Sequence, residues 1–144
     1  MRTLKITYRR RRGIFWNAFR SRPEEHPIDV DDIMATVRAT LDRLPLAATV
    51  DDLLLQLRGH IQLLLPKIEA KDWARHGQDD QIHLVTGFVR DRLSGEPMSG
   101  PAIVRCVYAQ ELAFICRDLV AVALAGPGAE APLAVITSNH FCRS

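Results

Sequence analysis

Apolar residues recur at intervals of three and four positions in four segments of this chain, and Pro, Gly or turn-forming residues separate the segments. Such spacing places apolar side chains on one face of an α-helix, whereas a half-buried strand needs strict alternation. The four segments lie at about 29–44, 50–70, 78–93 and 101–125. The pattern therefore predicts an all-α fold.

The first two segments contain helix-start and helix-stop signals. Acidic residues occupy the start of the first segment, as suits the positive end of a helix dipole, and Pro45 follows its end. Thr49 can cap the second segment, and Pro66 is expected to kink that helix or split it in two. Leu55 and Leu63 fall opposite the other leucines of the second segment, which predicts a central helix touched on several sides.

The third and fourth segments differ in how apolar they are. In the third, Ile82, Val85, Val89 and Leu93 should face inward, although Gly87 is a poor helix former. The stretch SGEPMSGP is a connector, and Gly126 ends the fourth segment. The fourth segment has too many apolar positions for one narrow stripe, so burial on most sides is expected. These positions are Ile103, Val107, Leu112, Phe114, Ile115, Leu119 and Val122.

A chain of 144 residues, 47% of them apolar, can bury one substantial core. The simplest arrangement is an up-down bundle of about four helices over residues 28–126, with a basic arm at 1–27 and an irregular tail at 127–144. Two short runs favour strands, Leu4 to Tyr8 and Leu133 to Thr137. They could pair as a small ribbon that joins the two termini.

The arm has a charge opposite to that of the remaining chain. Residues 1–22 hold eight of the 19 basic residues and none of the 17 acidic ones, which leaves 11 basic against 17 acidic residues, a net charge of −6, elsewhere. Large aromatic side chains stand among the arginines. We expect the arm to dock on an acidic protein surface, either of this chain or of a partner, through Arg9, Arg10, Arg11, Arg12, Phe15, Trp16 and Phe19. Nucleic acid and an anionic membrane surface are the alternatives.

The cysteines and histidines indicate neither disulfides nor a metal site. The three cysteines form no C-x-x-C pair, and no His or Glu spacing is typical of metal ligation, so no metal and no cofactor are expected. No stretch approaches the ~20 apolar residues of a membrane span. A cytoplasmic location is therefore expected.

The stretch LRGHI in the second segment has the most unusual polar residues. Arg58 and His60 lie at the edge of the apolar face, and Gly59 points away from it. In a structural interpretation, Arg58 extends along the surface, His60 makes one hydrogen bond and Gly59 allows another segment to approach closely. A catalytic interpretation makes His60 a general base at the mouth of a pocket, with Arg58 holding an anion.

Three stretches, LRGHIQLLLPKIEA, VRDRL and AQELAFICRDL, together resemble a family of small actinobacterial proteins of unknown function that are often labelled natural-product biosynthesis proteins. The resemblance covers about residues 28–120, and the motif ends with Ile68 and Glu69. The third segment departs from the family by carrying QIHLVTGF in place of a run rich in small residues. The resemblance implies a biosynthetic context, and it brings no established activity.

Three functions remain open. The first is a role in natural-product biosynthesis, as a cofactor-independent cyclase or isomerase acting on a small-molecule intermediate, or as an accessory subunit. Its candidate catalytic residues are Arg58, His60 and Glu69. The second is a regulatory or nucleic-acid-associated protein that binds through the arm, although no recognition helix is evident. The third is an interaction module, such as a homodimer formed through the second helix and the arm.

Overall fold

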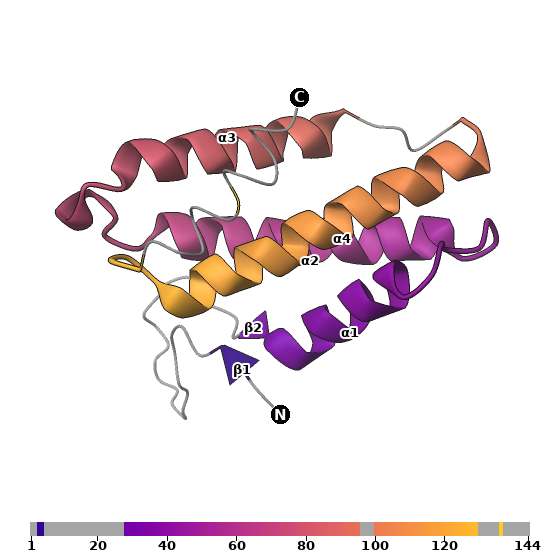
Figure 1. Cartoon of the computed structure of the whole chain (residues 1–144), viewed down its shortest axis with the longest axis horizontal. Helices are drawn as coiled ribbons and strands as arrows, with labels where there is room; N and C mark the ends of the chain where they lie inside the picture. Colours follow the sequence, from indigo (N-terminus) through magenta and orange to yellow (C-terminus); the bar gives the residue numbers. More distant parts are fainter. Residues whose placement is uncertain (1–2, 5–27, 96–99, 130–135, 137–144) are drawn as a thin grey trace, which may run out of the picture.

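A computed structural model of the chain describes residues 3–4, 28–95, 100–129 and 136, and four α-helices account for most of them (Figure 1). The helices are α1 (Val30–Leu41), α2 (Val50–Glu69), α3 (Asp79–Ser94) and α4 (Ala102–Ala125). A 3-10 turn, η2 (Ala74–His76), precedes α3, and two short strands are β1 (Thr3–Leu4) and β2 (Ile28–Asp29). The predicted all-α class is confirmed.

Helix α1 begins and ends where its local sequence requires. The Asp29 carboxylate accepts a hydrogen bond from the backbone N–H of Asp32 at 3.1 Å, which caps the helix N-terminus. Val30, Ile33 and Val37 are buried along one face. The helix ends at Leu41, three residues before the predicted end at 44, since the residue before Pro45 is driven out of helical geometry and Leu44 is exposed.

Helix α2 is continuous through Pro66, so the expectation that the helix would split there is wrong. Proline removes one backbone donor, and the helix needs only one further turn beyond it. The N–H of Ala70 donates to the carbonyl of Pro66 at 3.0 Å and closes that turn. Trp73 is buried beyond the helix end, where its indole N–H donates to the carbonyl of Ile68 at 2.6 Å.

Successive helices run in opposite directions, which confirms the predicted up-down bundle (Figure 1). Helix α2 contacts α1, α3 and α4, and α4 packs across both α1 and α2. The contacts of α2 with three helices agree with the predicted central position, although Leu55 and Leu63, on which that prediction rested, are exposed. The core between these helices includes Leu54, Leu57, Ile61, Leu64, Leu112 and Leu119, all fully buried.

One face of α4 does not have the burial expected from its sequence. Ile103 and Val107 are each 55% exposed, and Phe114 is 41% exposed. Helices α1, α2 and α3 lie against the other sides of α4, and no described segment covers this face. The expected burial of α4 therefore holds on its other sides and fails on this face. On α2, Leu55 and Leu63 are likewise exposed.

Strand β1 pairs with β2, whereas the run Leu133 to Thr137, which could have paired with the N-terminal run, lies outside the described residues except for Ile136. The pairing is antiparallel, with Thr3 opposite Asp29 and Leu4 opposite Ile28. Residues 5–27, which hold all the arginines and aromatic residues assigned to partner binding, lie outside the described residues. Within the described part of the chain, no helix is long and apolar enough to cross a membrane.

Candidate functional site

Helix α2 carries all three candidate catalytic residues, but it directs them to different places. At about 100° per residue, His60 lies roughly 160° around the helix from Arg58 and about 180° from Glu69. Arg58 and Glu69 both face α3, yet they are about three turns apart, or roughly 16 Å along the axis. The structure therefore brings none of the three together.

Arg58 ties α2 to the C-terminal end of α3. Its guanidinium Nη1 donates a hydrogen bond to the carbonyl of Leu93 at 2.6 Å. The last carbonyls of a helix have no partner within it and carry partial negative charge, so a cation is favourable there. The Tyr108 hydroxyl of α4 donates to the neighbouring Arg92 carbonyl at 2.7 Å. Side chains from α2 and α4 thus donate hydrogen bonds to carbonyls in the last turn of α3.

His60 faces α1, where it meets a threonine. The distance between His60 Nε2 and Thr36 Oγ1 is 3.2 Å, and Thr36 Oγ1 is also 3.3 Å from both Gln56 Oε1 and the Asp32 carbonyl. Burial lowers the pKa of His60 from 6.5, and the nearby Asp32 carboxylate partly opposes that shift. Neutral imidazole is therefore the favoured form of His60 at neutral pH.

The Thr36–His60 contact is the arrangement in the described residues that comes closest to catalytic geometry. An imidazole within hydrogen-bond distance of a hydroxyl can accept its proton and activate the oxygen as a nucleophile. However, Thr36 is buried, at 7% exposed, and threonine hydroxyls within helices commonly bond a carbonyl one turn earlier. Sequence reasoning missed Thr36 because it lies 24 positions before His60. The sequence feature that could have identified Thr36 is the presence of two threonines, Thr36 and Thr40, among the inward positions of α1.

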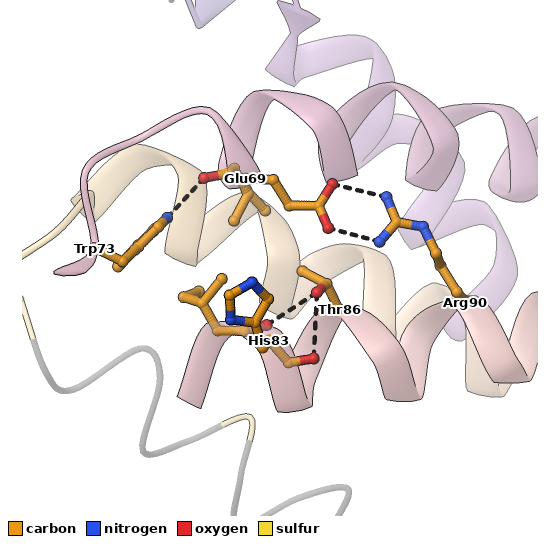
Figure 2. Close-up of polar contacts among 7 residues, drawn as sticks. Glu69, Trp73, His83, Thr86 and Arg90 are labelled. Carbon is orange, nitrogen blue, oxygen red and sulfur yellow. Dashed lines mark hydrogen bonds and ion pairs between the residues drawn. The ribbon is translucent and has the colours of Figure 1, made fainter. Parts of the chain in front are cut away.

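Glu69 forms a bidentate ion pair with Arg90 of α3, at 2.6 and 2.7 Å (Figure 2). The hydrogen bond from Arg90 is the main cause that lowers the pKa of Glu69, and partial burial opposes it. The carboxylate is therefore ionised and occupied at neutral pH, which does not suit a general acid. Because the Arg90 and Glu69 side chains are 51% and 31% exposed, the pair contributes little to stability.

Residues around this ion pair also have structural partners. Thr86, one turn before Arg90, donates to the carbonyl of Ile82 at 3.0 Å (Figure 2). His83 lies on the surface, with its Nδ1 3.7 Å from the Asp79 carboxylate. Within the described residues, no group of three or more His, Cys, Asp and Glu side chains is placed to hold a metal ion.

The two described cysteines are poorly suited to nucleophilic chemistry. Cys106 and Cys116 are both buried in α4, and burial raises the pKa of the Cys116 thiol to about 12. A thiol with such a pKa is protonated at neutral pH and is a weak nucleophile. The Cys106 Sγ contacts the carbonyl of Pro45 at 3.1 Å. Cys142 lies outside the described residues.

Comparison with known proteins identifies a family over the helical part of the chain. No curated protein and no solved structure matches the chain. A family model described as a family of unknown function, DUF6415, matches residues 31–128, which is more than half of the chain and spans all four helices. The chain therefore belongs to the DUF6415 family of proteins of unknown function.

Proposed function

We propose that this protein is a helical accessory protein of natural-product biosynthesis, which acts by binding an acidic surface of another protein through its basic arm. The biosynthetic context comes from the resemblance of the LRGHI region. The acidic nature of the partner follows from an arm with eight basic residues and no acid in positions 1–22.

One observation supports binding over catalysis: each of the three candidate catalytic residues of α2 contacts a neighbouring helix of the bundle. Arg58 bonds the end of α3, Glu69 pairs with Arg90, and His60 contacts α1. Catalytic groups must converge within about 3 Å of common reacting atoms. Arg58 and His60 leave α2 on nearly opposite sides, and Glu69 lies more than two turns further along the helix. The contacts with neighbouring helices are sufficient to explain why a leucine-rich helix carries these polar residues, and no substrate is needed in that explanation.

The described residues on either side of residues 5–27 lie together. Because β1 pairs with β2, Leu4 lies opposite Ile28 at the start of α1. Asp29, Asp31 and Asp32 also lie at the start of α1. Attraction between the basic arm and an acidic partner is screened by ions, so binding should weaken as salt concentration rises.

The Thr36–His60 contact supports a second candidate, a cofactor-independent enzyme. Its imidazole is favoured in the neutral form, as a general base requires, and it lies 3.2 Å from a hydroxyl. In this case His60 Nε2 accepts the Thr36 proton, the threonine oxygen adds to a carbonyl carbon of a small-molecule intermediate, and the C=O π electron pair moves to the carbonyl oxygen.

Genetic complementation can separate the two candidates. We would delete the gene in its source organism and profile metabolites after complementation with wild type, His60→Gln, Thr36→Val, or a variant with serine at positions 9–12. Serine at these positions leaves Thr3 and Leu4 in place to pair with β2. The matched control replaces three exposed arginines of the body, Arg38, Arg43 and Arg75, with serine. Each protein must accumulate to the wild-type level.

The accessory function predicts that the deletion changes the metabolite profile, that His60→Gln and Thr36→Val restore it, and that only the arm variant fails. Failure of both His60→Gln and Thr36→Val, with an intermediate accumulating and the arm variant active, would favour the enzyme. An unchanged profile after gene deletion would contradict a biosynthetic role altogether.

A further inference from the structure

The exposed face of α4 has a regular pattern that the bundle does not use. Its positions are separated alternately by four and three residues, so they form one stripe along a helix of 24 residues. The stripe consists of Ile103, Val107, Gln110, Phe114, Arg117, Ala121 and Leu124. Ile103 and Val107 are 55% exposed and Leu124 is 49% exposed, which is high for large apolar side chains.

The other sides of α4 already have partners within the chain. Gln110 at the edge of the stripe donates to the Thr40 carbonyl of α1 at 3.1 Å. On the α3 side, Glu111 accepts a hydrogen bond from Arg92 at 2.6 Å. Buried residues such as Leu112 and Leu119 pack inward. Apart from this hydrogen bond of Gln110, the stripe is therefore the side of α4 that the described segments leave exposed.

The pattern of polar and apolar positions in the stripe is the same in both directions from its centre. Phe114 is central, a polar residue stands on each side of it at positions 110 and 117, and apolar residues occupy both ends. A surface with this symmetry is complementary to itself when a second copy is turned by a two-fold axis. We propose that two copies of this protein associate through α4, antiparallel, about a two-fold axis near Phe114.

This pairing gives each part of the stripe a suitable neighbour. Ile103 and Val107 of one copy lie near Leu124 and Ala121 of the other, and the two Phe114 rings meet at the axis. The Arg117 guanidinium, 4.9 Å from the centre of the Phe114 ring in its own chain, lies beside Gln110 of the second copy. Polar residues therefore meet on both sides of the axis.

The area of the stripe sets the strength of the association. A helix of 24 residues is about 36 Å long, and a face about 10 Å wide covers roughly 400 Å² in each copy. Stable interfaces bury about 800 Å² per partner, so α4 alone supports a weaker dimer. We expect a dimer that dissociates on dilution, with a dissociation constant in the micromolar to millimolar range.

Sedimentation equilibrium of the full-length protein, from about 1 µM to about 1 mM, tests the proposal. Wild type should pass from monomer to dimer in this range, and Phe114→Glu should weaken the association at least about tenfold, since it places two like charges at the axis. The control is Leu84→Glu on α3, where the native leucine is 56% exposed. Circular dichroism must show that all three proteins keep their helical content.

Disulfide trapping tests the direction of the pairing in a Cys142→Ser background. Phe114→Cys should form a covalent dimer on oxidation, whereas Leu84→Cys should not. A mixture of Ile103→Cys and Leu124→Cys proteins should form mainly the mixed dimer, because an antiparallel arrangement places these positions together. If the main product were instead a disulfide between two Ile103→Cys chains, that arrangement would be contradicted.

Two sedimentation results would overturn the proposal. One is a monomer over the whole concentration range, and the other is an equal loss of association in Leu84→Glu and Phe114→Glu. Neither result depends on the proposed accessory function, because the arm plays no part in this interface. Equally, a dimer that forms as expected gives no support to the biosynthetic role.

Discussion

At the scale of single residues, the polar side chains of LRGHI are best understood by what each one contacts. Arg58 and His60 leave α2 on nearly opposite sides and bond α3 and α1 respectively. Gly59 between them is exposed, and a methyl group added there would meet no atom of the described residues within 4 Å. The expectation that another segment approaches closely at Gly59 is therefore not met within this part of the chain.

Gly59→Ala should stabilise the protein by about 0.5–1 kcal/mol, because alanine is the better helix former and the site has room for its methyl group. Gly77→Ala is the matched control. That glycine is equally open but has a φ of 72°, where a side chain is strained, so the control should lower the free energy of unfolding. Urea unfolding measures both. A destabilised Gly59→Ala protein would contradict the open environment.

The lowered pKa of His60 should make stability depend on pH. Since the unfolded chain binds a proton more readily than the folded one, the free energy of unfolding should fall as pH drops through 6.5 toward the folded pKa. Asp32, the charged group near His60 on α1, limits the size of the effect. Urea unfolding of wild type and His60→Gln at about pH 7.5 and about pH 5.5 measures the contribution of His60 to this pH dependence. Identical pH dependence in both proteins would show that His60 is not responsible.

At the scale of elements, α3 depends on side chains from neighbouring helices. Its final carbonyls accept hydrogen bonds from Arg58 of α2 and Tyr108 of α4, and Arg90 and Arg92 pair with Glu69 and Glu111. The three remaining helices pack closely on one another around the core. Helix α3 should therefore open at a lower free energy than α2 or α4.

Tyr108→Phe should lower the free energy of α3 opening by about 1 kcal/mol, because it leaves the Arg92 carbonyl without this donor while the buried ring stays in place. Native-state hydrogen exchange should show faster exchange in α3 and nearly unchanged exchange in α2. Ser94→Ala is the control, since the Ser94 hydroxyl bonds only the exposed Asp91 carbonyl of its own helix. An equal effect of the control would show that Tyr108 has no special role.

At the scale of the whole molecule, burial of the two described cysteines gives a measure of cooperative unfolding. Cys116 lies in the core, and Cys106 is buried in α4 against the carbonyl of Pro45 in the connection between α1 and α2. In a Cys142→Ser protein, a thiol reagent should react with neither cysteine until the bundle unfolds. The labelling rate should then give the same free energy as urea unfolding, while rapid labelling of native protein would show that α4 opens locally.

The sequence alone determined the helical segments and most of the core. Apolar spacing located all four helices to within a few residues, and Ile82, Val85, Val89 and Leu93 are buried as expected. Capping residues, prolines and side-chain periodicity are local properties, so they can be read along one chain. The same local signals overestimated the effect of Pro66, because the packing of neighbouring helices on α2 supports its last turn.

Only the tertiary structure decided which apolar faces are covered and which polar groups meet. Composition indicated that α4 is apolar on several sides, but the number of helices around it determined that the stripe centred on Phe114 stays exposed. The Thr36–His60 and Glu69–Arg90 contacts join residues 24 and 21 positions apart. Such contacts depend on how helices are placed beside one another, because spacing within a single helix cannot specify the partner that faces it.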